Sequence, residues 1–142
     1  MLLLKSNGAK DFYSGLTPTK SGATALSLDE HHIFPVNSKI GKLIVKNYAG
    51  TSNSDIINNV ANLALITNET NRKRIREKNP SVYITQFEDE YIKAGKQKEF
   101  LEIMKSQFIS PKMILLLKDD KFEEFIYERT MLIEKQIEKL CS

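Results

Sequence analysis

A short apolar run that leads directly into a helical segment is the strongest constraint on the fold of this chain. Leu63-Ala64-Leu65-Ile66 is bounded by the polar residues Asn62 and Thr67, and such a run predicts a buried strand. Glu69 to Lys78 contains neither Gly nor Pro, which favours a helix that stops at Pro80. The sequence therefore predicts a strand followed at once by a helix.

The residues after Pro80 predict a mainly helical C-terminal extension. Ser81 is expected to cap a helix that ends at Gly95, and a second helical spacing runs from Phe100 to Phe108. Ser110-Pro111 is typical of a helix start, a cap followed by a first-turn proline.

A last helix is expected to begin with a cap at Asp119 or Asp120. Its three-four repeat comprises Phe122, Phe125, Ile126, Arg129, Ile133, Ile137 and Leu140. We expect most of the apolar positions in the extension to pack in the core. At the other end of the chain, a short helix from Leu2 is expected to give way to a loop that reaches Lys20. The fold class expected is α+β.

Composition excludes several classes of protein. The 142 residues suit one compact domain. No apolar run approaches the roughly 20 residues of a membrane-spanning helix, and Met1 to Leu4 is too short for a signal peptide. We therefore expect a cytoplasmic protein without a membrane partner. The single cysteine, Cys141, excludes an intrachain disulfide and a zinc site built on a cysteine pair.

The two histidines of the chain are adjacent, at His31 and His32. Neighbouring side chains of an extended strand point to opposite faces, so both can serve one site only if the backbone bends or other ligands wrap around it. A pair of this kind is more often at the surface or in a capping position than in a site. The pair alone is weak evidence for chemistry.

The histidine pair, the strand and the helix that follow it together form a pattern that is typical of a known protein family. His31-His32-Ile33-x-Pro35, followed by Asn62-x-x-Leu65 and Asn71-Arg72, resembles the HNH family of His-Me finger nucleases. The chain is more closely similar to the C-terminal nuclease domain of modification-dependent restriction enzymes of the GmrSD type. The segments that carry this similarity are 8–12, 30–35, 61–73, 78–84 and 122–129.

The resemblance implies a ββα-metal (HNH) core at 26–80, flanked by a helix and loop at 1–25. The helical extension at 81–142 would pack on that core to give a single domain. It further implies a metal-dependent endonuclease that hydrolyses DNA phosphodiester bonds as the cutting module of a bacterial restriction or defence enzyme. The implied partners are DNA and an N-terminal ParB-like NTPase domain or subunit that these 142 residues do not include. A homodimer is left open.

Carried over by position, the resemblance makes His32 the general base and Asn62 the residue that holds the His32 loop. An imidazole has a reference pKa of about 6.5, which suits proton transfer near neutral pH. His31 and Asn71 would hold one divalent metal ion. An amide oxygen favours Mg²⁺, whereas a histidine ligand also admits Mn²⁺, Ni²⁺ or Zn²⁺. Asp29 and Glu30 have no mapped role and could join the metal ligands or orient a histidine.

A basic segment follows the expected metal ligand. Residues 72–78 hold five positive side chains and one negative, a net charge of five minus one, or +4. On an α-helix Arg72 and Arg76 share a face, with Lys73 less closely aligned, so these three are expected to contact DNA phosphates. A solvated helix face is the alternative interpretation.

Two other functions stay open from the sequence alone. One is a non-catalytic DNA-binding module of the same fold, and the other is an interaction domain whose last helix packs on a partner. Retention of His31, His32, Asn62 and Asn71 together argues against both. A Ser, Thr or Cys nucleophile is disfavoured because no further histidine is available to act as its base.

Overall fold

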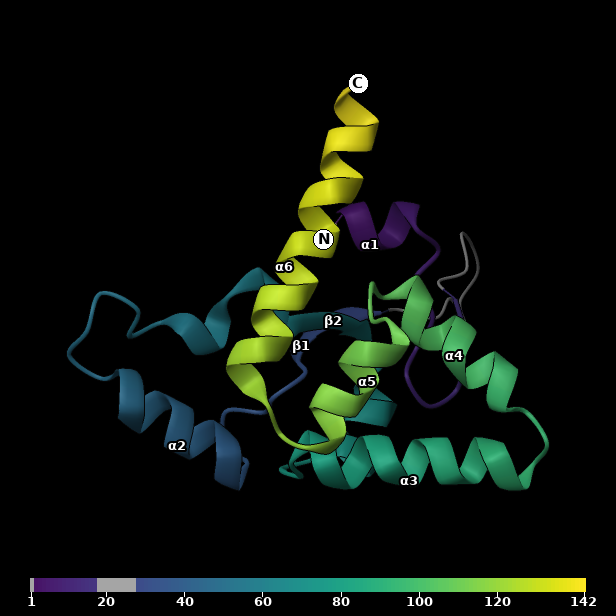
Figure 1. Ribbon diagram of the computed structural model, residues 1–142. Helices are drawn as coiled ribbons and strands as arrows, with labels where there is room; N and C mark the ends of the chain where they lie inside the picture. Colours follow the sequence, from purple (N-terminus) through teal and green to yellow (C-terminus); the bar gives the residue numbers. More distant parts are fainter. Residues whose placement is uncertain (1, 18–27) are drawn as a thin grey trace.

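The protein is an α+β molecule with a small sheet at its centre (Figure 1). The structure, a computed structural model, describes residues 2–17 and 28–142. Strand β1 (Asp29–His32) pairs antiparallel with β2 (Leu63–Ile66), which places His31 opposite Ala64 and His32 opposite Leu63. The predicted strand Leu63–Ile66 is confirmed residue for residue.

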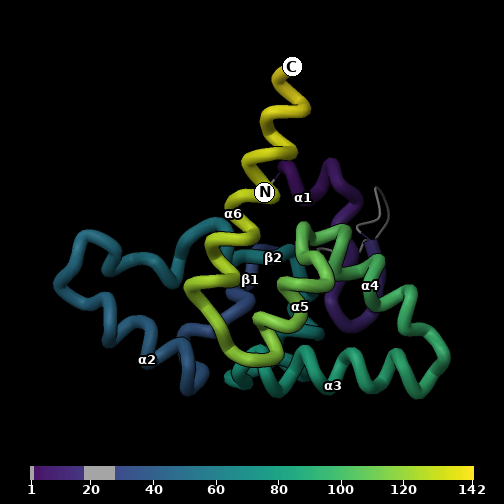
Figure 2. Tube along the Cα trace, viewed as in Figure 1, coloured from purple at the N-terminus to yellow at the C-terminus, as the bar shows by residue number. Residues whose placement is uncertain are grey.

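Helices make up most of the remaining structure. They are α1 (Leu2–Ser6), α2 (Lys39–Tyr48), the short 3-10 turns η1 (Ile56–Asn58) and η2 (Val60–Asn62), the π-helix η3 (Thr70–Ile75), α3 (Pro80–Lys93), α4 (Gln97–Ser106), α5 (Pro111–Lys118) and α6 (Phe122–Cys141). Figure 2 shows α2 on one side of the sheet and α4 on the other, with the C-terminal end of α6 projecting away from the body. No helix among the described residues combines the length and apolar character needed to cross a membrane.

The N-terminal part agrees with expectation where it is described. The expected short helix is present as α1. The end of the expected loop at Lys20 and the boundary between 25 and 26 lie outside the described residues. Helix α2 was not predicted from the sequence. It forms because the Ser38 hydroxyl accepts a hydrogen bond from the Gly41 amide at 3.0 Å, and because Gly41 packs so tightly that a Cβ there would lie 1.9 Å from the Pro35 carbonyl oxygen.

Three predicted helix boundaries are wrong. The helix expected to run from Glu69 to Lys78 ends at Ile75. A single contact explains the other two. Helix α3 begins at Pro80 with Asn79 as its cap, so Ser81 lies inside the helix. The Ser81 amide and hydroxyl both donate to the Asp120 carboxylate, at 2.8 and 2.6 Å. Asp120 therefore accepts hydrogen bonds from the first turn of α3 instead of capping α6, and Lys121 occupies the cap position of α6. The Ser110-Pro111 start of α5 is confirmed, with the Ser110 hydroxyl accepting from the Met113 amide at 3.3 Å.

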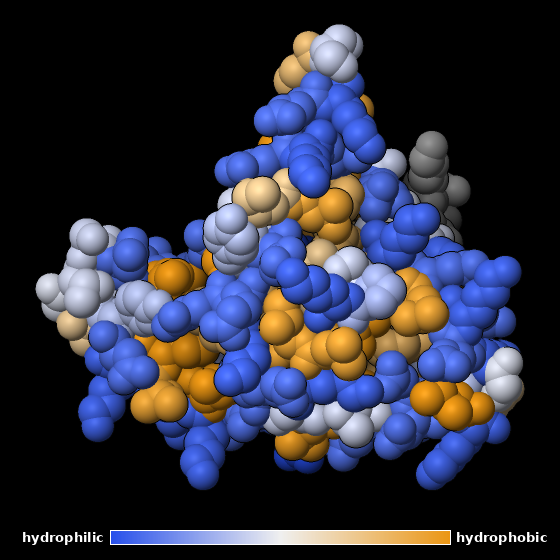
Figure 3. All heavy atoms as spheres, in the orientation of Figure 1, coloured by the Kyte–Doolittle hydropathy of each residue, from blue (hydrophilic) through white to orange (hydrophobic). Residues whose placement is uncertain are grey.

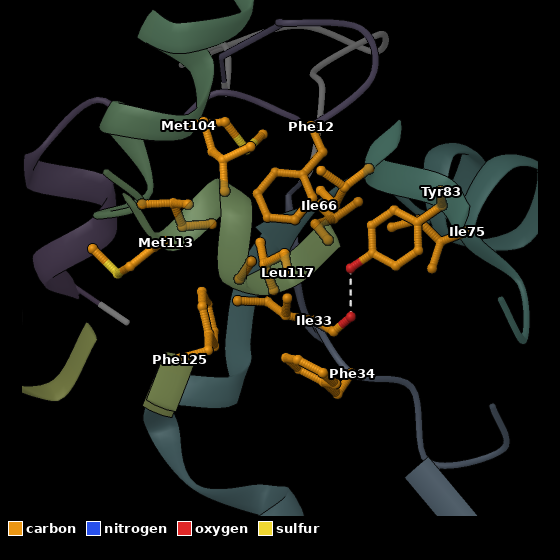
Figure 4. Close-up of a cluster of buried hydrophobic side chains, with 14 of the residues drawn as sticks. Phe12, Ile33, Phe34, Ile66, Ile75, Tyr83, Met104, Met113, Leu117 and Phe125 are labelled. Carbon is orange, nitrogen blue, oxygen red and sulfur yellow. Dashed lines mark hydrogen bonds between the residues drawn. The ribbon is translucent and has the colours of Figure 1, made fainter. Parts of the chain in front are cut away.

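One hydrophobic cluster joins the sheet region to the C-terminal helices (Figure 4). It unites side chains from residues 26–80, such as Ile33 and Ile66, with side chains from 81–142, such as Leu117 and Phe125. The last helix follows its predicted repeat only in its first half. Phe122, Phe125, Ile126 and Arg129 are buried, whereas Ile137 is 48% exposed and Leu140 is 65% exposed.

The exposed end of α6 is an exception to the expectation that most apolar positions of the extension pack in the core. The reason is geometric, since this end of the helix extends beyond the body of the molecule. On the face drawn in Figure 3 the surface is mostly hydrophilic, and apolar side chains gather over α2 and α5.

Candidate active site

The backbone that follows His32 is clamped by the buried side chain of Asn62. The Asn62 carbonyl accepts from the Ile33 amide at 2.7 Å, and its side-chain oxygen accepts from the Phe34 amide at 2.8 Å. The Asn62 side-chain nitrogen donates to the Phe34 carbonyl at 3.3 Å and to the Ile57 carbonyl at 2.8 Å. Asn62 therefore lies where a residue that holds the His32 loop would have to lie.

A tyrosine from α3 completes this clamp. The buried Tyr83 hydroxyl donates to the Ile33 carbonyl, so each polar backbone group of Ile33 and Phe34 has a partner (Figure 4). Burial, assisted by the Asp120 carboxylate, holds the pKa of Tyr83 far above its ordinary value. Tyr83 therefore acts as a hydrogen-bond donor, and the backbone that follows His32 is hydrogen-bonded by Asn62 from η2 and by Tyr83 from α3.

This donor gives a pH-dependent prediction for Tyr83→Phe. Below pH 10 the variant is expected to be less stable than the wild type by about 1 to 3 kcal/mol, because a buried carbonyl loses its donor. Unfolded tyrosine releases its proton above about pH 10 and folded Tyr83 does not, so the wild type alone loses stability there. The difference between the two proteins should therefore shrink by about 1.4 kcal/mol per pH unit above that point.

Urea unfolding over a series of pH values measures this difference. Tyr127→Phe is the matched control, because Tyr127 is 64% exposed and its replacement is expected to change stability by less than about 0.5 kcal/mol. A difference between the wild type and Tyr83→Phe that is the same at neutral and strongly alkaline pH would contradict a buried, protonated Tyr83.

Arg129 of α6 supports the Asn62 turn from the opposite side. The buried guanidinium donates to the carbonyls of Ala61 and Leu63, both at 2.7 Å, and to the Gln107 carbonyl at 3.0 and 3.2 Å. Ala61 and Leu63 are the neighbours of Asn62 in the chain. Burial lowers the pKa of Arg129 to about 9. Helix α6 thereby holds Asn62 in place, and Asn62 in turn holds the His32 loop.

The His32 ring is half-buried and faces the segment that precedes Asn62. Its Nε2 lies 2.7 Å from the Asn58 side-chain oxygen. The Asn58 side-chain nitrogen in turn donates to the Asp55 carboxylate at 2.6 Å. Neither Asp55 nor Asn58 was singled out from the sequence.

His31 lies beside the start of the helical segment that follows β2. Its Nε2 is 3.2 Å from the side-chain oxygen of Asn68. Asn71 lies three residues beyond Asn68, within the same helical segment. The Asn71 amide donates to the Thr67 carbonyl at 3.0 Å, which fixes Asn71 in the first turn. The structure thus brings His31 and the helical turn that carries Asn71 into one region.

A buried carboxylate anchors this strand-to-helix junction. Asp11, which is fully buried, accepts from the Thr67 amide at 2.8 Å and from the Thr70 hydroxyl at 2.6 Å. The same carboxylate accepts from the Ser14 amide and hydroxyl, both at 2.9 Å. Charge-assisted bonds of this kind are the strong ones, so Asp11 holds the turn that carries Asn68 and Asn71 in place.

The basic segment differs from an ordinary α-helix. η3 is a π-helix in which the Arg76 amide donates to the Asn71 carbonyl at 2.7 Å, and Arg76 itself has a positive φ of 53° and lies beyond the helix. The α-helical spacing that predicted a shared face for Arg72 and Arg76 therefore does not apply. Both nevertheless line one surface hollow, together with Asn71, Glu77 and Lys78.

Lys73 points elsewhere. It pairs with Glu69 at 3.5 Å, both side chains being exposed, and it lines a second hollow together with Arg74 and Tyr13. The Arg74 guanidinium lies 4.2 Å from the centre of the Tyr13 ring. Of the three cations expected to contact phosphate, the structure groups Arg72 and Arg76 beside Asn71 and separates Lys73 from them.

The acidic residues near the histidines are few. Asp29 and Glu30 are exposed on β1, opposite Ile66 and Leu65. Within residues 2–17 and 28–142 no three His, Cys, Asp or Glu side chains gather in a way that could hold a metal ion.

Six residues that build the site were not identified as site residues by the sequence analysis, namely Asp11, Asp55, Asn58, Asn68, Tyr83 and Arg129. Asp55 and Asn58 stand three residues apart just before Asn62, a spacing that fits one turn of helix, and this was the available signal. The contact of Asp11 with Thr67 spans 56 residues, and no local pattern indicates it.

Comparisons of the chain with protein-family models, with curated proteins and with solved structures found no match. The geometry of the site and the sequence pattern therefore carry the assignment of a function.

Proposed function

We propose that this chain is a metal-dependent nuclease domain that hydrolyses DNA phosphodiester bonds, with His32 as its general base. The observation that supports the proposal best is the clamp around Ile33 and Phe34, in which Asn62 and Tyr83 bond each backbone amide and carbonyl after His32. A base must be held within hydrogen-bond reach of the water that it deprotonates, and a rigid loop provides this.

The arrangement of elements also supports a ββα-metal core. Strand β1 carries the histidine pair and pairs antiparallel with β2, and β2 leads into the helical segment that carries Asn71. The resemblance to HNH nucleases implies two paired strands followed by a helix, and in this chain α2 and the turns η1 and η2 lie between the two strands. In that setting the domain would act in the bacterial cytoplasm beside a ParB-like NTPase partner.

His31 and Asn71 fit a divalent metal ion by the chemistry of their donor atoms. The amide oxygen of Asn71 suits a hard cation. The His31 Nε2 approaches a second amide oxygen, that of Asn68. When bound, a divalent cation would offset the negative charge that develops on the phosphate oxygens.

Residues of this chain have three roles in the proposed chemical step. His32 accepts a proton from a water molecule while the water oxygen forms a bond to phosphorus and the bond to the leaving oxygen breaks. Asn62 and Tyr83 keep the His32 backbone in place. Arg72 and Arg76, which line the hollow beside Asn71, attract the phosphates of the nucleic acid without reading its sequence.

A cleavage assay tests the proposal. The purified chain is incubated with supercoiled plasmid in EDTA, Mg²⁺, Mn²⁺ or Ni²⁺. We expect nicking in at least one metal and none in EDTA, because the reaction requires a Lewis acid at the phosphate. Absence of cleavage of plasmid, single-stranded DNA and RNA in all metals would overturn the nuclease assignment.

A non-catalytic DNA-binding module is the second candidate, favoured by the grouping of Arg72, Arg76 and Lys78 in one hollow. It predicts binding that weakens steeply with salt and a complete lack of metal-dependent cleavage. Arg72→Ala and Arg76→Ala should each reduce the salt dependence under either function. The cleavage assay therefore decides between the two candidates.

A further inference from the structure

The short turn before Asn62 carries a polar chain that ends on the His32 ring. Asp55 accepts from the Asn58 side-chain nitrogen at 2.6 Å, and the Asn58 side-chain oxygen lies 2.7 Å from His32 Nε2. The turn is held in place at its centre, because Ile57 is buried and its carbonyl accepts from the Asn62 side chain at 2.8 Å. Asn62 thus positions both the His32 backbone and the residues that meet the ring.

The chemistry of these groups fixes the direction of each hydrogen bond. An ionised carboxylate only accepts, so the amide nitrogen of Asn58 must face Asp55. The amide oxygen of Asn58 must then face His32, and an amide oxygen also only accepts. His32 therefore donates from Nε2, and in the neutral ring the lone pair lies on Nδ1.

We propose that Asn58, oriented by Asp55, is the positioning residue of His32, which it holds as the Nε2-protonated tautomer with Nδ1 free to accept a proton. The catalytic consequence rests on the proposed nuclease function, whereas the tautomer does not. In the reaction, Nδ1 would take the proton of the attacking water and Asn58 would keep its hydrogen bond to Nε2. Support of this kind for a functional histidine typically changes rates by about 10-fold to 10²-fold.

Nitrogen NMR of the labelled full chain tests the tautomer directly, at a pH where the imidazole rings are neutral. Correlations between the ring protons and the two ring nitrogens report which nitrogen carries the proton. In the wild type we expect His32 to be predominantly protonated at Nε2. In Asn58→Ala we expect a mixture of both tautomers, and in Asp55→Asn a partial shift, because a neutral amide no longer dictates how Asn58 is turned.

Two controls bracket the measurement. His31 serves as an internal control, because its Nε2 faces Asn68 rather than Asn58 and its signals should not move in Asn58→Ala. Asn53→Ala is the matched variant, which replaces an exposed asparagine of the same segment. It should leave the tautomer and the cleavage rate unchanged.

Cleavage kinetics provide the second measurement. Asn58→Ala is expected to lower kcat by about 10-fold to 10²-fold with little change in KM, because the ring is misoriented and DNA binding is untouched. Asn58→Asp retains an acceptor for Nε2 and should recover part of the tautomer preference. A wild-type His32 protonated mainly at Nδ1, or an Asn58→Ala variant with an unchanged tautomer, would overturn the inference.

The two proposals fail in different ways. If the chain cleaves no nucleic acid but the His32 tautomer depends on Asn58, the nuclease function fails and the positioning role stands. If cleavage requires His32 while Asn58→Ala changes neither the tautomer nor kcat, the positioning role fails and the function stands.

Discussion

His32→Ala is expected to slow DNA cleavage by about 10² to 10⁴, the usual contribution of a general base. Metal dependence and DNA affinity should be retained, because neither the proposed metal ligands nor the basic hollow is altered. Cleavage of supercoiled plasmid under single-turnover conditions measures the effect, and circular dichroism checks that the variant is folded. The half-buried ring leaves a solvent-accessible space, so added imidazole should restore part of the rate.

The matched control for this experiment is Asn53→Ala, which changes an exposed polar side chain in the segment that faces His32. It is expected to cleave at the wild-type rate. A folded His32→Ala protein that also cleaves at the wild-type rate would show that another group takes the proton, and the nuclease assignment would lose its base.

Arg129→Met is expected to destabilise the fold by about 3 kcal/mol or more. The substitution leaves the carbonyls of Ala61, Leu63 and Gln107 without their donor, and each buried orphan costs roughly 1 to 3 kcal/mol. Part of this cost is offset because the buried charge is itself unfavourable, as the lowering of the Arg129 pKa to about 9 indicates. Urea denaturation measures the net loss.

Two variants sharpen this test. Arg129→Lys keeps the charge but has no planar fork to span the three carbonyls, so an intermediate loss is expected. Glu128→Gln, the adjacent position, removes only a surface pair with Lys112 and should change stability by less than about 1 kcal/mol. Wild-type stability in Arg129→Met would contradict a structural role for this guanidinium and its support of Asn62.

Local sequence patterns were sufficient to predict those strands and helix starts that depend only on neighbouring residues. The apolar run Leu63–Ile66 could be recognised as a buried strand because its continuous apolar character and its polar boundaries are visible without any distant partner. Ser110-Pro111 starts a helix because the cap and the first-turn proline act on the same few backbone groups. The pattern of His31, His32, Asn62 and Asn71 indicated the elements from which the candidate site is proposed, namely β1, the turn before β2 and the helical segment after it.

Contacts between residues far apart in the sequence decided the roles of Asp120 and Arg129. Asp120 satisfies the start of α3 across 39 residues, so the cap expected from its place before α6 did not form. Arg129 looked like one position of an apolar repeat, and only the fold shows that it bonds the carbonyls on either side of Asn62, more than 60 residues away.

The sequence by itself therefore determined the α+β class, the strand-to-helix junction and the residue types of the candidate site. The tertiary structure alone decided how those residues are held: Asp11 on the junction, Asn62 and Tyr83 around the His32 loop, and Asn58 on the His32 ring. The physical reason is that buried polar groups must find partners wherever the packed chain provides them, and those partners are set by the fold rather than by separation along the sequence.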